Sequence, residues 1–298
     1  MNSLGLYLSN PRYIGLALLR RMKWLPDGLF LRLRFLFEQR AVLHLSKPRT
    51  FQEKIQWLKL NRRKPEYTTM VDKYAVKDFV AQKIGAEYII PTLGVWDSFD
   101  QIDFDSLPDK FVLKTTHGGG NGGVVICRGK ASFDYDNARA KLTASLSGDI
   151  YANLREWPYK NVPRRIIAEQ FIEETGKEDL TDYKFYCFNG VPRYIQVIQD
   201  RNSHETIDFY DTDWTKQEFY GLNPVAKPAS HTMPLPDSLP TMLDIARKLS
   251  VGTEFLRVDL YTVGSKVYFG ELTFFPASGF GTFTPEKWNL TLGEMIEI

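Results

Sequence analysis

Residues 110–128 limit what this chain can fold into more than any other stretch. Two β-prone runs, at 111–113 and 124–126, flank a segment in which five of six consecutive residues are glycine. Such a pattern predicts a β-hairpin with a glycine loop at its tip. Glycine lets the backbone approach a ligand closely, and successive free N–H groups can bind an anion. Because Lys114 adds a fixed positive charge at the end of the first run, the hairpin suits the phosphates of a nucleotide.

Two familiar nucleotide motifs are excluded. Gly118, Gly120 and Gly123 satisfy G-x-G-x-x-G, but a dinucleotide-binding fingerprint needs a helix after the glycines, and here a β-branched run follows. The chain contains no G-x-x-x-x-G-K-[ST]. A flexible surface hairpin without a ligand remains open as the alternative to a phosphate-binding lid.

Composition indicates an ordinary globular protein with no strong charge bias. Of the 298 residues, 43% are hydrophobic and 25% are charged, and the net charge is +2. No run is long enough for a transmembrane helix, and the first residues lack the charged n-region of a secretory signal. Cys127 and Cys187 each lie in an apolar run, where packing is more common than a disulfide. These features predict a cytoplasmic protein.

The first fifty residues differ from the rest in charge. They carry nine basic and two acidic residues, a local net charge of +7. Two helical patterns at 11–38, broken at 26–28, interleave apolar and basic positions. Docking on the inner face of the membrane or on a biosynthetic complex is one interpretation. The other, which we favour at this point, is a helical cap that packs on its own domain with its arginines in water.

The remaining pattern mixes separate helices with strands and predicts an α+β fold. Thr50 and Glu53 have the spacing of a capping box at the start of a helix. Further helices are predicted at 71–86, 133–150 and 238–249, and strands at 88–91, 94–96, 165–171, 183–189, 193–198, 206–210, 255–261 and 267–272.

The last two predicted strands carry an acidic pair. Arg257 and Asp259 share one face of the first strand, and Glu271 and Thr273 share one face of the second. If the strands pair in register, Asp259 and Glu271 come within reach of each other. Two such carboxylates suit Mg²⁺, which also holds phosphates. The alternative is that these charges lie on the wet face of a hairpin.

A further acidic pair, Asp211 and Asp213, follows an apolar run in the manner of the metal-binding D-x-D of glycosyltransferases. No βα nucleotide-sugar domain precedes it. We therefore predict that this segment forms a strand, an acidic turn and a second strand.

Taken in order, these pieces resemble the ATP-grasp fold. They are Lys73 after an aspartate, Lys114 before the glycine hairpin, Glu169 in an apolar strand, and the two acidic strands. Phrases at 50–59, 72–77, 156–160, 182–185 and 269–274 are similar to its TupA-like branch, named for teichuronopeptide biosynthesis. The resemblance implies a helical region at 1–71 and an ATP-grasp domain at 72–298, with a lid subdomain at about 107–166 and a C-terminal subdomain at about 167–298.

The resemblance also implies roles for individual residues. It assigns ATP binding to Lys73, Lys114, His117, Gly118, Gly119, Gly120, Gly122, Gly123, Glu169, Gln170, Phe171, Ile172 and Asp182. It assigns Mg²⁺ to Asp259, Glu271 and Thr273, where Thr273 replaces the asparagine usual in the fold. Arg257 and Lys184 are the expected catalytic cations. Lys184, Arg201, Arg193 and Lys160 are candidates for holding an acceptor.

The activity implied by this resemblance is an ATP- and Mg²⁺-dependent carboxylate–amine ligase acting through an acyl-phosphate. By analogy with the branch, the carboxylate is a uronic acid of a bacterial surface polysaccharide, and the amine is an amino acid or another small amine. A sugar kinase on the same frame and a glycosyltransferase are the alternatives. No nucleic acid is expected as a partner.

Overall fold

The structure is a computed structural model, and it describes residues 11–174, 176, 179–199, 205–222 and 227–298. Within these residues the chain forms a four-stranded sheet of order β1-β4-β2-β3, a five-stranded sheet of order β10-β9-β5-β6-β7, and a short ladder of β11 and β8. The strands are β1 (Thr92–Trp96), β2 (Phe111–Thr115), β3 (Val124–Cys127), β4 (Ile166–Gln170), β5 (Asp182–Phe188), β6 (Val191–Gln199), β7 (Thr206–Asp211), β8 (Tyr220–Gly221), β9 (Phe255–Val263), β10 (Lys266–Thr273) and β11 (Phe283–Thr284). All paired strands are antiparallel, so the fold is α+β as predicted.

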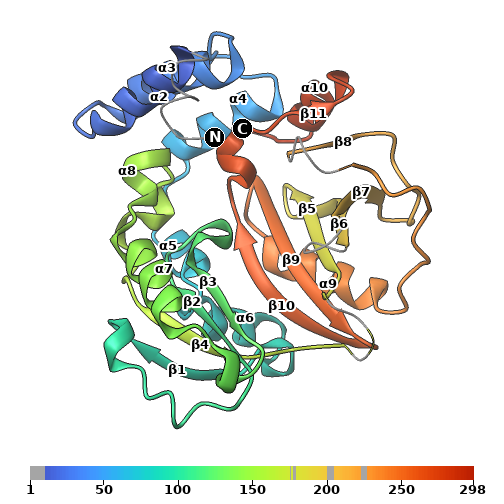
Figure 1. The fold of residues 1–298 in the computed structure, drawn as a ribbon. Coiled ribbons are helices and arrows are strands. Elements are labelled where there is room, and N and C mark those ends of the chain that lie inside the picture. Colours follow the sequence, from blue (N-terminus) through green and yellow to red (C-terminus); the bar gives the residue numbers. More distant parts are fainter. Residues whose placement is uncertain (1–10, 175, 177–178, 200–204, 223–226) are drawn as a thin grey trace.

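Helices surround both sheets (Figure 1). The α-helices are α2 (Pro11–Arg21), α3 (Asp27–Gln39), α4 (Phe51–Asn61), α5 (Glu66–Val71), α6 (Ala75–Ile84), α7 (Tyr135–Ser147), α8 (Ile150–Leu154), α9 (Leu239–Ser250) and α10 (Lys287–Glu294). Short 3₁₀ turns are η1 (Ala86–Tyr88), η2 (Phe99–Gln101), η3 (Gly120–Gly123), η4 (Lys130–Ser132), η5 (Trp157–Asn161) and η6 (Pro276–Gly279). The capping box of α4 is confirmed, because the Thr50 hydroxyl accepts from the Glu53 N–H at 3.3 Å and the Glu53 carboxylate accepts from the Thr50 N–H at 3.1 Å.

Two local predictions need correction. The helix predicted at 71–86 is confirmed as α6 but begins later, at Ala75, because Val71 ends the preceding α5 and the Asp72 carboxylate accepts from the Tyr74 and Ala75 N–H groups in the turn between the two helices. The strand predicted at 88–91 is absent from this described segment. The chain makes η1 there, closed by the Ile89 N–H on the Ala86 carbonyl, and the strand begins only at Thr92.

The four-stranded sheet contains the predicted glycine hairpin. β2 and β3 pair antiparallel with Lys114 opposite Val124, and η3 lies in the loop between them. The sheet also takes in β1 and β4, so it extends past both ends of the lid subdomain predicted at about 107–166. The reason is that β4 pairs with β1 on one side and β2 on the other. The subdomain boundaries, including those of the lid, remain predictions.

The five-stranded sheet contains most of the core. Every residue of β5 is buried, and its two faces differ in chemistry. Tyr183, Phe185 and Cys187 point to the side that α9 covers. The opposite side begins with Asp182 and Lys184 and ends in an aromatic cluster that packs on α4, where the rings of Phe51 and Phe255 meet at 5.1 Å. The polar end of this face is the end beside the four-stranded sheet, with β10 as the edge strand (Figure 1).

The N-terminal helices form a unit of their own on top of the two sheets. Leu19, Leu25, Phe30, Leu31, Phe35 and Leu43 pack together as a separate apolar cluster under α2 and α3. Arg155 of the segment after α8 anchors this unit, since its guanidinium donates to the Lys23 and Leu25 carbonyls and pairs with Asp27 at 3.2 Å.

Candidate functional site

The glycine loop is shaped by one polar pair beneath it. The Thr115 and Ser145 hydroxyls are hydrogen-bonded at 2.7 Å. A Cβ at Gly118 or Gly123 would lie 2.2 Å from the Thr115 hydroxyl oxygen, so only glycine fits at these two positions. At Gly122, by contrast, no atom lies within 4 Å of such a Cβ. The loop is therefore fixed at its two ends and has room around Gly122.

Glu169 connects the hairpin to α6. Its carboxylate lies 2.6 Å from the Lys114 ammonium and 2.6 Å from that of Lys77. Burial raises the pKa of Glu169, but the two ammonium groups outweigh burial and lower it below its usual value. Lys77 was not among the predicted site residues. Its one signal in the sequence was its position four residues after Lys73, which is the spacing of one helical turn.

The acidic strands pair as predicted, with Glu271 opposite Asp259 and Thr273 opposite Arg257. The Arg257 guanidinium donates to both Asp259 oxygens at 2.7 Å and to Glu271 at 3.1 Å. It also donates to the Thr273 hydroxyl at 3.0 Å. Lys184, opposite Asp259 on β5, pairs with the same Asp259 carboxylate. The interpretation as charges on a wet face fails for Asp259, because its side chain is 1% exposed.

Lys73 joins the glycine loop to the acidic strands. Its backbone N–H donates to the Thr116 carbonyl at 3.0 Å, and its ammonium donates to the Gly118 carbonyl. The same ammonium lies 3.8 Å from the Glu271 carboxylate. Two groups far apart in the sequence, Gly118 and Glu271, thus meet at one lysine.

The pKa of Glu271 reflects the cations that surround it. Burial raises its pKa, but four cations outweigh burial and lower the pKa to about 2; they are Lys73, Arg257, Lys184 and Lys114, in order of strength. The side chain is 39% exposed, so solvent screens part of this attraction. Glu271 is thus the carboxylate of the site that an incoming ligand can reach.

The donor set fits Mg²⁺ in part. Two carboxylates and a hydroxyl are hard oxygen ligands, and the Thr273 hydroxyl lies 3.4 Å from Glu271. Glu271 is accessible, whereas both oxygens of Asp259 are engaged by Arg257 and Lys184. Among the described residues, no group of three or more His, Cys, Asp and Glu side chains gathers as a ready-made metal site. The residues fit a metal that is shared with phosphate oxygens better than one held by protein ligands alone.

The other predicted nucleotide residues have differing surroundings. Burial lowers the pKa of His117, so its imidazole is neutral at pH 7. Asp182 is buried with an oxygen 3.9 Å from the Lys184 ammonium. Phe171 follows β4, and the Arg128 guanidinium lies over its ring at 5.2 Å. Of its neighbours, Gln170 is exposed and Ile172 is half-buried. Gly119 and Gly120 lie in the glycine loop.

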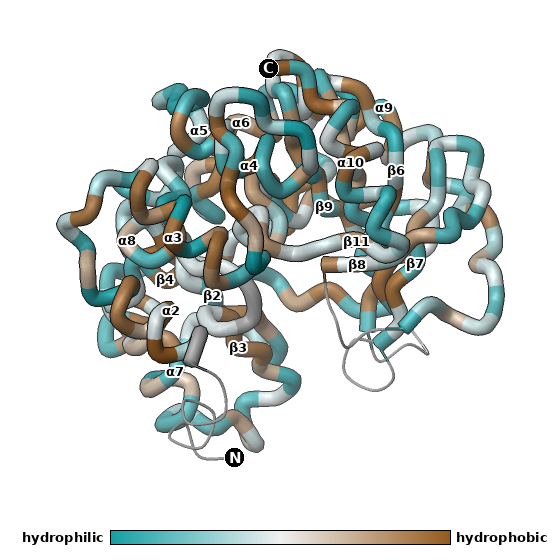
Figure 2. Tube along the Cα trace, turned by 90° about the horizontal axis from the view of Figure 1, so that it is seen from above, coloured by the Kyte–Doolittle hydropathy of each residue, from teal (hydrophilic) through white to brown (hydrophobic). Residues whose placement is uncertain are grey.

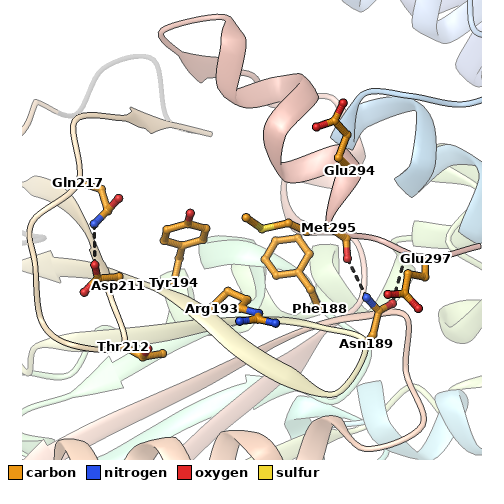
Figure 3. A pocket seen from close by; sticks show the side chains of 10 residues that line it. All are labelled: Phe188, Asn189, Arg193, Tyr194, Asp211, Thr212, Gln217, Glu294, Met295 and Glu297. Carbon is orange, nitrogen blue, oxygen red and sulfur yellow. Dashed lines mark hydrogen bonds between the residues drawn. The ribbon is translucent and has the colours of Figure 1, made fainter.

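The candidates for holding an acceptor do not converge. Arg201 lies outside the described residues. Lys160 is exposed, with its ammonium 5.1 Å from the Tyr151 ring. Arg193 lines a pocket of about 450 Å³ at the far end of the five-stranded sheet (Figure 3). Because Phe188 of this pocket is four residues beyond Lys184 along β5, the pocket begins about 13 Å from that lysine. Of the three candidates within the described residues, Lys184 is the one that lies beside Asp259 and its partner Arg257.

The loop after β10 is held by a set of side chains that the sequence analysis missed. Gln52, Gln56 and Lys59 follow one another along one face of α4 and donate to the carbonyls of Gly281, Gly279 and Ser278 at 2.8, 2.9 and 2.8 Å. The sequence signal was the polar stripe itself, since three long polar side chains at helical spacing face the core and not the solvent.

The Asp211 side chain stabilises a turn. One of its oxygens accepts from the Asp213 and Thr215 N–H groups at 3.1 and 2.8 Å, and the other from the Gln217 amide at 3.1 Å. This is the acidic turn that the sequence analysis favoured over a metal-binding D-x-D.

Several solved structures are similar to this chain at low sequence identity, whereas no curated protein matches it. D-alanine–D-alanine ligase from Helicobacter pylori is 17% identical, with a TM-score of 0.47, covering 83% of this chain and 69% of that one. N5-carboxyaminoimidazole synthetase from Staphylococcus aureus, complexed with ADP, is 13% identical, with a TM-score of 0.44 and coverage of 84% and 60%. D-alanine–D-alanine ligase from Bacillus anthracis, complexed with ATP, is 14% identical, with a TM-score of 0.40 and coverage of 69% and 53%.

A family profile gives the decisive match. The TupA-like ATPgrasp profile matches residues 53–297. This range contains α6, the glycine hairpin, both sheets and every contact of Lys73 described above. Because the match covers most of the chain and takes in the whole of the candidate site, the chain belongs to the TupA-like ATP-grasp family.

Proposed function

We propose that the protein is an ATP- and Mg²⁺-dependent carboxylate–amine ligase. The observation that carries the proposal is the convergence of cations on Glu271: the Arg257 guanidinium lies 3.1 Å and the Lys73 ammonium 3.8 Å from its carboxylate, and Lys184 and Lys114 act on it from farther away. Cations from separate elements, next to an anion-binding glycine loop, suit the phosphates of ATP. Family membership supports the choice of nucleotide.

In the proposed reaction, an oxygen of the substrate carboxylate attacks the γ-phosphorus of ATP and releases ADP. An amine nitrogen then attacks the carbonyl carbon of the acyl-phosphate, phosphate leaves, and the nitrogen loses a proton to give an amide. Such a reaction depends on positioning and charge neutralisation more than on a protein nucleophile. Arg257 and Lys184 are buried beside Asp259, so both cations are held in place before a substrate arrives.

In this proposal Glu271 and Thr273 hold Mg²⁺, which supplies further charge neutralisation at the phosphates when it is bound. Asp259 has a different part, because it orients Arg257 through two hydrogen bonds of 2.7 Å. It could contact the metal only after Arg257 or Lys184 had turned toward the phosphates.

The glycine loop at Gly122 is expected to close over the nucleotide, as the open space around it allows.

The substrate is proposed from the family. We infer that the carboxylate belongs to a uronic acid of a bacterial surface polysaccharide and that the amine is an amino acid or another small amine. The loop after β10, with Phe280 and the backbone that α4 holds, is the proposed floor for the sugar. We infer that the protein acts in the cytoplasm, where ATP is available.

The test is to incubate the purified protein with ATP, MgCl₂ and uronates, with and without amines, and to measure ADP and free phosphate. Phosphate release that depends on both the carboxylate and the amine is expected. ADP formation without free phosphate would identify a kinase instead, and indifference to ATP would refute both. Glu271→Gln should lower turnover at least about a hundredfold, while Glu286→Gln, an exposed change just before α10, should leave it unaltered.

A further inference from the structure

The N-terminal helices present a second apolar face on the outside of the molecule. Their inner face packs on the cluster around Phe30 and Phe35, which is the expected face of an amphipathic helix. The outer side is apolar as well, and six large hydrophobic side chains of this region are exposed: Ile14, Leu18, Trp24, Leu29, Leu36 and Val42. Trp24, in the connection between α2 and α3, is 75% exposed.

The spacing of these residues places them on one stripe of each helix. Ile14 and Leu18 are four residues apart on α2, and Leu29 and Leu36 are seven apart on α3. Figure 2 looks down on this end of the molecule and shows hydrophobic segments along both helices. α2 and α3 pack against each other, so the two stripes lie close together at this end of the molecule.

The charge of this surface is of one sign. Seven of the bases in this region are exposed: Arg20, Arg21, Lys23, Arg32, Arg40, Lys47 and Arg49. Both acids of the region are engaged elsewhere, since Asp27 pairs with Arg63 and Arg155, and Glu38 pairs with the buried Arg34. Within the described part of the chain, none of the seven bases has an acidic partner.

We propose that this face docks on an anionic lipid bilayer. Exposed leucines and a tryptophan among unpaired arginines match the acyl and headgroup layers of such a surface. The described helices include none with the length and hydropathy of a membrane span, so α2 and α3 would lie in the plane of the interface. The helices pack on their own domain, as the sequence-based preference for a cap expected, and the proposal adds a partner for their outer face. It goes beyond the proposed reaction without depending on it.

The experiment is flotation of the full-length protein with vesicles of phosphatidylcholine alone or mixed with phosphatidylglycerol. Binding is expected with the anionic vesicles only, and it should weaken as NaCl rises from about 0.1 M to about 0.5 M because salt screens the attraction. Leu18→Ser combined with Trp24→Ser should lower binding at least about tenfold. Arg21→Glu combined with Arg32→Glu should do the same, because each charge near the surface is worth roughly a factor of five.

Matched controls lie on other surfaces. Val251→Ser removes a side chain that is 72% exposed, and Lys141→Glu reverses an exposed charge on α7. Neither should change binding. All variants should keep ATP turnover in the absence of vesicles, so a failure of this proposal is separable from a failure of the ligase proposal.

Equal binding to neutral vesicles, no binding to either kind, or equal losses in the controls would overturn the proposal. So would a dimer seen by light scattering that Leu18→Ser with Trp24→Ser dissolves, since the face would then serve self-association.

Discussion

The buried pair of Lys59 and Glu156 offers a sharp test of how the loop after β10 is held. The Lys59 ammonium is fully buried and donates to the Leu154 carbonyl at 3.0 Å and to both the carbonyl and the hydroxyl of Ser278 at 2.8 Å. Glu156 is buried and hydrogen-bonded to the same Ser278. Burial lowers the pKa of Lys59 to about 7 and raises that of Glu156, and each group opposes the shift of the other.

Removing one partner should destabilise the protein strongly. Lys59→Met leaves the Glu156 carboxylate in the interior without its cation, and such losses cost about 3–5 kcal/mol. Glu156→Gln leaves the Lys59 ammonium buried without its anion, and at low pH it should destabilise the protein by a similar amount. The double variant removes both charges, so its free energy of unfolding should fall by less than the sum of the two single losses.

The single variants should respond to pH in opposite directions. In Lys59→Met, the folded-state pKa of Glu156 is raised above its unfolded value near 4.5, so the folded protein binds more protons and stability falls as pH rises above that value. In Glu156→Gln, the folded-state pKa of Lys59 lies below about 7, far under its unfolded value of 10.5, so stability rises with pH between those limits. Each slope can reach roughly 1.4 kcal/mol per pH unit.

The assay is urea unfolding from pH 5 to pH 9 for the wild type, both single variants and the double variant. Slopes of the single variants are taken relative to the double variant, which lacks both groups and therefore any pH dependence from this site. The exposed pair of Lys248 and Asp244 is the control, because removing either charge there should leave stability nearly unchanged. Slopes of the same sign in the two single variants would refute the idea that the two groups share one buried site.

Three further predictions concern the nucleotide site. Gly123→Ala places a Cβ 2.2 Å from the Thr115 hydroxyl, so it should cost about 1–3 kcal/mol of stability, while Gly122→Ala should leave the melting temperature unchanged and lower only ATP affinity. Equal melting shifts in the two variants would contradict the geometry. Glu169→Gln should destabilise the protein at pH 7, and the difference from wild type should shrink below pH 4.5, because the lowered pKa of Glu169 contributes stability that is lost as pH falls through it. A pH-independent difference in urea unfolding would argue against this contribution of Glu169 to stability. Amide exchange over 116–124 should slow when a non-hydrolysable ATP analogue binds, and equal exchange would leave the loop without a lid function.

The parts of the site that could be predicted from sequence are those set by local rules. A strand alternates its faces every residue, and a hairpin brings its two strands into register, so alternation and pairing suffice to place Asp259 beside Glu271. The glycine loop was predictable for the same reason. Thr50 and Glu53 signalled the start of α4 through hydrogen bonds between residues three apart.

The parts that escaped prediction depend on long-range packing. The contact of Lys77 with Glu169 requires α6 to lie against β4, and the two side chains are far apart in the sequence. The stripe of Gln52, Gln56 and Lys59 was interpreted through its apolar neighbours, since no local rule states that a helix will turn amides toward backbone carbonyls near the other end of the chain. Periodicity identifies the buried face of a helix but not the chemistry of what it faces.

These long-range contacts give each largely buried cation of the site an anion as its partner. A lysine removed from water favours its neutral form unless an anion lies close by. Each cation here has such an anion: Lys114 and Lys77 share Glu169, Arg257 and Lys184 share Asp259, and Lys73 lies beside Glu271. Because Glu169 and Asp259 each hold two cations, the site carries more positive than negative charge near the glycine loop. A nucleotide polyphosphate could balance that excess of positive charge.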